Sequence, residues 1–294
     1  MKISSILQQM QSWVLPVLFL VACSQISYGQ SINQSDNTGG LTFTGEHSHY
    51  GPGSGVSSAH LLTAENDPGQ WHFLIEPYFM FANVHGTEGI GNLPDIHVDQ
   101  SPSDIFNHLK FGAMIYAEAS KGPWKISSDL IYLKLGANVS GTRLIYSGDA
   151  STKQLSWELA LLRKFTPWLD AGLGAQLNSI SADYNIAINT PAGAFITGGS
   201  RSKTWVDPSI IGNAHFDLSP KWSLLIRGNI GGFGIGSKFY WQMQAYAGYH
   251  LSQLFSISAG YRAIGIDYES GSGADRFLYD VNTFGPVIRF GFSF

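Results

Sequence analysis

The sequence is short of charged residues, of cysteine and of long apolar runs. Only 13% of its 294 residues are charged, about half the share found in ordinary soluble domains. Mean hydropathy is +0.01, and past residue 30 no apolar run approaches the roughly 20 residues that a membrane helix needs. The low charge argues against an ordinary water-soluble surface, and the missing runs exclude a helical membrane protein.

The single cysteine, Cys23, lies in a segment that has the order of an export signal. Within residues 1–29, Lys2 precedes an apolar stretch that gives way to small and polar residues. Two outcomes compete: cleavage after "SYG", before Gln30, or lipidation of Cys23 within the lipobox-like "LVAC". We predict cleavage before Gln30, which leaves a mature chain with no cysteine and therefore neither a disulfide nor a thiol nucleophile.

A net charge of −4 gives no electrostatic basis for binding nucleic acid, whose partners concentrate basic side chains. The aromatic content is 13% and there are 34 glycines. With moderate hydropathy, this composition leaves two all-β classes, a sandwich and a membrane barrel.

Side chains alternate in character from Trp71 onward, after a Ser-, Gly- and Asn-rich stretch (30–69) that we interpret as a flexible leader. In "WQMQAYAGYHL", Trp241 and every second residue after it are apolar or amphipathic, and the residues between them include no aliphatic side chain. This period of two is that of β-strands. It predicts ten strands: 71–83, 110–120, 123–136, 153–165, 167–180, 203–218, 221–231, 238–251, 254–268 and 277–294.

Connections between these strands are alternately short and long. Three of the short ones carry Pro followed by Trp, in "KGPW", "FTPW" and "LSPKW". Trp124, Trp168 and Trp222 would then lie at one level, as in the aromatic belt of a membrane barrel. Short turns on one side and long loops on the other are typical of an outer-membrane barrel.

The face opposite the apolar one decides between barrel and sandwich. A soluble sandwich exposes a face rich in Lys, Glu and Asp, whereas here that face carries mainly Gly, Ser, Gln, Asn and Tyr. We therefore predict an all-β, transmembrane, up-and-down antiparallel barrel over residues 70–294. Its partners would be outer-membrane lipid and, through a C-terminal strand that ends on Phe294, the barrel-insertion machinery.

Three stretches resemble a family of bacterial outer-membrane β-barrel proteins without an assigned activity. They are "WHFLIEPYFMFANVHGTEGIG", "VDQSPSDIFNHLKFGAMIYAEASKGPW" and "SSDLIYLKLG", which together run from Trp71 to about Leu135. The resemblance implies an integral protein of the Gram-negative outer membrane. It implies no activity, cofactor or ligand.

Charged residues on the polar face predict an ion-pair network inside the barrel. Because unpaired charges in a narrow lumen are costly, we expect acids and bases there to pair, and closure should bring Arg289 near Glu76. The alternative is a selective path for a small charged solute. The predicted members are Glu76, Glu118, Asp129, Glu158, Asp170, Arg227, Arg262 and Arg289.

One short helix is predicted in the first long connection, within "DQSPSDIFNHL". Ser101 or Ser103 can cap it, Pro102 suits its first turn, and Ile105 begins a short apolar stripe. The helix, over residues 101–109, would either fold inward as a plug or lid over the barrel mouth or lie outside as a loop helix.

No arrangement of residues indicates catalysis, a cofactor or a metal site. His215 and Asp217 alternate on one strand, but beside a short turn. The sequence therefore favours a non-enzymatic barrel with a structural or surface-interaction role. A narrow or gated transporter of a small solute is the second reading, and an outer-membrane hydrolase is the third. About eight strands leave an interior just filled by side chains, so free diffusion through ten is not expected.

Overall fold

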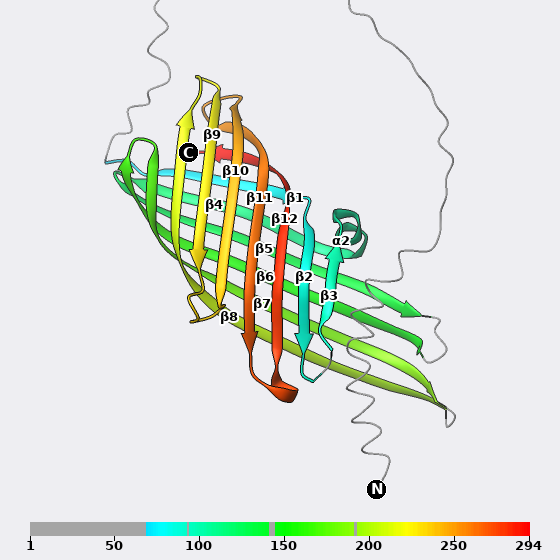
Figure 1. The fold of residues 1–294 in the computed structure, drawn as a ribbon. Coiled ribbons are helices and arrows are strands. Elements are labelled where there is room, and N and C mark those ends of the chain that lie inside the picture. Colours follow the sequence, from blue (N-terminus) through cyan, green and yellow to red (C-terminus); the bar gives the residue numbers. More distant parts are fainter. Residues whose placement is uncertain (1–68, 93, 141–144, 191–192) are drawn as a thin grey trace, which may run out of the picture.

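The computed structural model describes residues 69–92, 94–140, 145–190 and 193–294, and in them one antiparallel sheet closes on itself (Figure 1). The export signal, its two alternative ends and nearly all of the proposed leader lie outside the described residues.

The elements follow one another with little intervening chain. Their bounds are β1 (His72–Met80), β2 (Asn83–Ile90), β3 (Ile96–Gln100), α2 (Pro102–His108), β4 (Leu109–Lys121), β5 (Trp124–Ser140), β6 (Ile145–Thr166), β7 (Leu169–Thr190), β8 (Gly193–Asp217), β9 (Trp222–Gly231), β10 (Phe239–His250), β11 (Phe255–Ser270), the 3-10 turn η1 (Gly273–Asp275) and β12 (Phe277–Ser293).

From β4 to β12 each strand pairs with the next, and β1 pairs with both β4 and β12. This closes a ten-stranded, up-and-down antiparallel barrel in which β1 and β2 act as two halves of the first strand. The predicted fold class is confirmed. Closure satisfies the backbone groups that lipid would otherwise leave unpaired.

The first strand is interrupted, contrary to the single strand predicted over 71–83. β12 pairs with β1 through its C-terminal half and with β2 through its N-terminal half. The break lies at Phe81 and Ala82, opposite Gly285 and Pro286. A Cβ on Gly285 would lie 2.0 Å from the carbonyl oxygen of Phe81, so glycine is what allows the chain to pass there.

Several predicted loops are strand in the structure. The stretch 84–109 contains β2, β3 and α2, and most of 137–152 and 181–202 extends β5 to β8. These four strands have 17 to 25 residues, whereas β9 has 10. They project past the rest of the wall on the side away from the C-terminus (Figure 1). Their outer ends are rich in Ser, Gly and Asn, which is why the sequence suggested loops.

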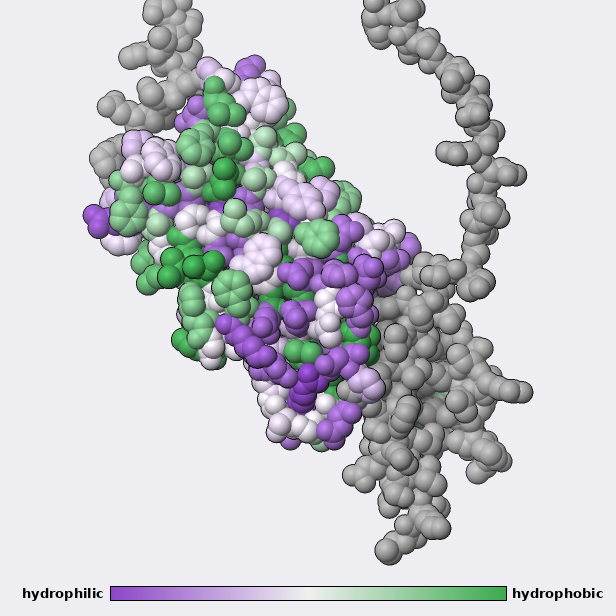
Figure 2. All heavy atoms as spheres, viewed as in Figure 1, coloured by the Kyte–Doolittle hydropathy of each residue, from purple (hydrophilic) through white to green (hydrophobic). Residues whose placement is uncertain are grey.

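An apolar belt surrounds the half of the barrel nearest the short turns. On β12 the outward residues from Phe284 to Phe292 are apolar, and the next outward residues are Asn282 and Asp280. Figure 2 shows hydrophobic residues gathered over this half and hydrophilic ones over the other. The belt matches the apolar band of an outer-membrane barrel, so the chain is an integral outer-membrane protein.

The three predicted belt tryptophans lie where strands leave the short turns. Trp124 begins β5, Trp168 directly precedes β7, and Trp222 begins β9. Each has about half of its surface exposed, at 50%, 47% and 49%. They lie beside the short turns and are half-exposed, and their place at the headgroup level of a membrane stays a prediction. Among the described residues, no helix is long and apolar enough to cross a membrane.

Beyond the belt the polarity of the wall reverses without a change in register. Ile264 and Ile266 point inward on β11, and Asp267 points outward between Ile266 and the inward Tyr268. On β12, Val281 is inward and Asp280 outward. The belt half is apolar outside and polar inside, while the outer half is polar outside and apolar inside.

Candidate functional site

Ion pairs between side chains of different strands fill the lumen inside the belt. Three arginines, each at most 3% exposed, contact carboxylates on other strands. The pairs are Arg227 with Glu158, Arg262 with Asp129, and Arg289 with Glu76. We call these six residues the ion-pair layer.

Arg289 on β12 holds the seam of the barrel. Its Nη1 lies 3.1 Å from Glu76 Oε2 on β1, and its Nη2 donates to Gln244 Oε1 at 2.8 Å. The guanidinium carbon is 4.1 Å from the centroid of the Tyr246 ring. Closure of the last strand against the first produces the contact that the sequence led us to expect.

Arg262 on β11 reaches across the lumen to β5. Its Nη1 lies 3.0 Å from Asp129 Oδ2 and donates to Tyr78 Oη at 2.8 Å. Tyr78 in turn donates to Asp129 Oδ1 at 2.7 Å, and Gln242 Oε1 accepts from Nε and Nη2 of Arg262. Tyrosine and glutamine thus satisfy the donors and acceptors that the ion pair leaves free.

Arg227 on β9 pairs with Glu158 on β6 across the intervening strands. The second oxygen of Glu158 accepts from the side-chain amide of Asn229, and Ser127 Oγ accepts from Arg227 Nη2 at 3.4 Å. Glu158 is 1% exposed. With both oxygens bonded, this buried carboxylate is fully compensated.

The remaining predicted acids, Glu118 and Asp170, share a cation that the sequence analysis missed. Lys125 Nζ lies 3.0 Å from Glu118 and 2.8 Å from Asp170. Lys125 has the same parity on β5 as Asp129, so strand alternation could have placed it in the lumen.

Asp207, fully buried on β8, was also missed by the sequence analysis. It accepts from Trp205 Nε1 at 3.0 Å and from the Ser237 hydroxyl at 2.8 Å.

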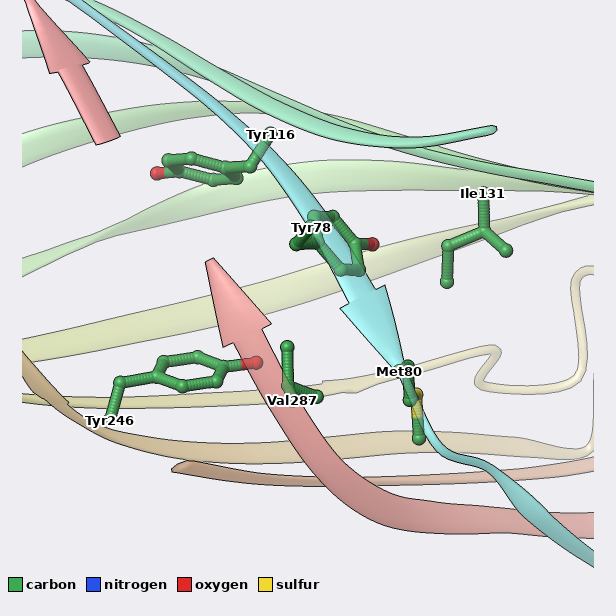
Figure 3. Packing of buried hydrophobic residues seen from close by; sticks show 6 residues of the cluster. All are labelled: Tyr78, Met80, Tyr116, Ile131, Tyr246 and Val287. Carbon is green, nitrogen blue, oxygen red and sulfur yellow. The ribbon is translucent and has the colours of Figure 1, made fainter. Parts of the chain in front are cut away.

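Tyrosine rings close the spaces between these charges. Figure 3 shows Tyr78, Tyr116 and Tyr246 entering one cluster from different strands, with Met80 and Ile131 toward the right of the view. The tyrosines are at most 5% exposed. Aromatic and charged groups therefore fill the lumen within the belt.

An apolar cavity of about 220 Å³ lies inside the outer half of the barrel. A second cavity of about 280 Å³ adjoins it toward the outer rim. Glu88, Ile180, Ala182 and Tyr279 line both. The apolar lining of the first includes Met80, Val84, Val98, Ile105, Met114, Ile131, Leu133, Ile264, Ile266 and Val281.

Glu88 is an inward-facing acid with no counter-charge. It lies on β2 opposite Tyr279, beyond the belt. No hydrogen bond or ion pair reaches its carboxylate from the described part of the chain. Burial alone raises the pKa of Glu88 from 4.5 to about 7. The sequence analysis missed Glu88 because it assigned residues 84–109 to a loop.

Other ionisable groups line the same two cavities. Arg276 is held by Asp95 at 2.6 Å and by Glu269 at 2.9 Å. Arg201 and Lys203, on β8, have no ion-pair partner in the described ranges. Besides Glu88, the ionisable residues that border the cavities are Asp99, Asp104, His108, Asp183, Tyr184, Arg201, Lys203, Asp275, Arg276 and Tyr279. The side chains of Asp99 and Asp183 are exposed to solvent, at 81% and 39%.

α2 covers a wedge in the wall between β3 and β4. β3 pairs only with β2, and the first half of β4 pairs only with β5. α2 begins at Ser101, where a capping box with Asp104 forms, and these hydrogen bonds lower the pKa of Asp104. Ile105 is buried and lines the cavity, while Phe106 packs on Phe81 with ring centroids 5.7 Å apart.

α2 therefore lies neither as a plug inside the ion-pair layer nor as a helix detached from the barrel, and a lid over the barrel mouth stays a prediction. It lies in the wall rather than in the ion-pair layer, and its buried face contributes to the interior cavity. Ser101 is the cap, one of the two predicted caps, and the helix ends at His108.

The proposed catalytic alternative has little around it. His215 Nε2 lies 3.1 Å from Asp217 Oδ1, and both side chains are widely exposed. Neither residue lines either cavity. In the described ranges, no three His, Cys, Asp or Glu side chains gather in a way that could hold a metal ion.

No protein-family model and no curated protein matches the chain. Among solved structures, the outer-membrane protease OmpT from Escherichia coli is similar with a TM-score of 0.46 and 10% identity, over 81% of this chain and 100% of that one. Ail of Yersinia pestis, bound to the heparin analogue sucrose octasulfate, has a TM-score of 0.34 and 12% identity over 77% and 99%. The toluene transporter TbuX of Ralstonia pickettii has a TM-score of 0.36 and 8% identity over 76% and 89%. These likenesses concern the barrel fold alone.

Proposed function

We propose that the chain is a non-enzymatic outer-membrane barrel that does not conduct ions and that acts through its projecting outer half. The observation that carries this proposal is the ion-pair layer. Its arginines and carboxylates are almost fully buried and bonded to groups on opposite strands. A ten-stranded wall leaves little room beside them.

The outer half supports a surface-interaction role. Strands β5 to β8 carry it beyond the belt, and its outward side chains are polar, such as Lys153 and Asp183, which pair at 3.3 Å. A wall that projects into water and is hydrogen-bonded along its length presents a rigid surface to other molecules.

Conductance in planar bilayers tests whether the ion-pair layer blocks the passage of ions. We expect no steady current through the wild-type barrel. The double variant Arg227→Ser, Glu158→Ser removes one buried pair together and should produce discrete current steps, because it empties part of the layer without leaving a lone charge. The exposed pair Lys153→Ser, Asp183→Ser is the matched control and should stay silent. Open-channel steps from the wild type would refute the proposal.

Deletion of residues 95–108 separates the ion-pair layer from α2 as the barrier. Because α2 lies in the wall above the layer, we expect its loss to leave the barrel without conductance. A rise in current after this deletion would instead make α2 the plug and would favour the second candidate function, a gated transporter of a small solute.

A further inference from the structure

Glu88 departs from the pattern set by the other lumen acids. Glu76, Asp129 and Glu158 each contact an arginine, and Glu118 contacts Lys125. Glu88 faces the interior with the cavities as its surroundings and has no partner in the part of the chain that the structure describes. A carboxylate in such a place is costly unless something binds it. The missing cation is the first indication of a ligand.

The space beside Glu88 has the size and character of a small-molecule site. The inner cavity of about 220 Å³ is lined mostly by aliphatic side chains. An apolar cavity of about 150 Å³ in another protein is large enough for benzene. A ring or a short branched chain therefore fits in the inner cavity, with its polar end at Glu88, where the two cavities meet.

We propose that this cavity binds a small apolar amine, whose hydrocarbon part occupies the inner cavity and whose ammonium group pairs with the carboxylate of Glu88. Small-molecule sites are usually lined by apolar side chains together with a few polar groups that fix the orientation of the ligand. The inference does not depend on whether the barrel conducts.

An anionic ligand fits these observations less well. Arg201 and Lys203 line the outer cavity, but neither is close enough to lower the pKa of Glu88, which responds to burial alone. The other ionisable groups near Glu88 are Tyr279, Asp275 and Arg276, and Arg276 is already bound by two acids. A carboxylate ligand in the inner cavity would bring a second negative charge to Glu88.

Calorimetry on the folded chain in lipid nanodiscs tests the proposal with three probes that share one ring. They are phenethylamine, phenethyl alcohol and hydrocinnamate, used at about pH 8, where Glu88 is ionised. We expect the amine to bind at least about tenfold more tightly than the alcohol. The anion should bind most weakly.

Two variants locate the binding. Glu88→Gln keeps the shape of the side chain and should abolish the preference for the amine while it leaves alcohol binding in place. Ala182→Trp fills the wall that both cavities share and should abolish binding of both. Ala175→Trp, on the lipid-facing side of the same strand, is the control and should bind like the wild type.

Four results would overturn the proposal. They are absence of amine binding to the wild type, equal or tighter binding of hydrocinnamate, an unchanged amine preference in Glu88→Gln, and unchanged amine binding in Ala182→Trp. Heat-modifiable gel mobility confirms in each case that the variant is folded, and the Glu88→Gln result stands by itself if Ala182→Trp does not fold.

Discussion

Single charged residues in the lumen differ in whether they have an ion-pair partner, and this difference sets the free energy of burying them. In the belt half, each arginine of the ion-pair layer contacts a carboxylate at the distance of a direct ion pair. In the outer half, Glu88 lies where the two cavities meet and has no ion-pair partner among the described residues. A glutamate is thus paired with an arginine at one level and left without a cation at the other.

Glu88 should make the stability of the folded chain depend on pH. Its pKa is about 7 in the folded chain against 4.5 in the unfolded chain. Below about pH 4.5 both states are protonated and the cost is absent; it grows as the pH rises and is complete above about pH 7, at up to about 3 kcal/mol. Glu88→Gln should therefore be more stable than the wild type at about pH 8 and equal at low pH.

Urea unfolding in detergent micelles across this range measures the effect. The neighbouring outward variant Thr87→Ala should keep the wild-type pH slope. Identical slopes for wild type and Glu88→Gln would show that Glu88 is compensated in solution.

Side-chain parity identified the lumen charges of the belt half, because strict alternation fixes which face each residue occupies. It also applied to Lys125 and Asp207, which were overlooked although they lie within predicted strands. Glu88 was out of reach, because its strand was assigned to a loop. The pairing of each acid with its base depends on the three-dimensional shape of the closed barrel. Sequence spacing predicts such a pair only where the last strand meets the first, at Arg289 and Glu76.

At the scale of elements, the broken first strand shapes the barrel. β1 closes the wall inside the belt, and β2 and β3 continue it outside. Where Gly285 of β12 lies against Phe81, between β1 and β2, there is no space for a side chain. The absence of a side chain at Gly285 therefore allows both halves of the first strand to pair with β12.

Gly285→Val should separate β12 from the first strand. A Cβ there would lie 2.0 Å from a backbone oxygen, so the chain must shift, at a cost of about 1–3 kcal/mol or more. Gly212→Val is the control, because nothing lies within 4 Å of a Cβ at that position. Urea midpoints and heat-modifiable mobility compare the two. Equal stability of both variants would contradict the close approach of Gly285 to the backbone of Phe81.

The elements were predictable where period two coincides with apolar residues. β10, predicted over 238–251 and observed over 239–250, is such a case. Strand extensions beyond the belt were not recognised, because their outward residues are Ser, Asn and Asp, which also favour turns. α2 was predicted from its cap and its proline, which are local signals. Its place in the wall depends on where β1 ends.

At the scale of the whole molecule, the two halves of the barrel have outer surfaces of different polarity. Lipid covers the belt, and water covers the projecting half. The polarity of the outward side chains changes between Phe284 and Asn282 on β12. The closed barrel could be predicted from the sequence, because the chain has too few charges for a water-soluble surface. The reversed interior could not, because it lies in segments assigned to loops.

Depth in the membrane can be tested on one face of one strand. Ile288→Arg places a charge within the belt and should lower the free energy of unfolding in lipid by about 2–4 kcal/mol. Asn282→Arg points the same way beyond the belt and should cost much less. Unfolding by guanidinium from lipid vesicles measures both. Equal costs would show that the belt is not where lipid lies.

The wedge under α2 is a gap in the backbone hydrogen bonds between β3 and β4, so the wall is easier to open there than between paired strands. Elsewhere a molecule that passes between bilayer and interior would have to break a ladder of backbone hydrogen bonds. At the wedge, the barrier is a helix of seven residues, and helices this short are marginal by themselves. Phe106 on the helix and Phe81 and Phe111 on the chain beside it have exposed aromatic rings. In the described part of the wall, this wedge is therefore where the fewest backbone hydrogen bonds oppose local separation of two neighbouring strands.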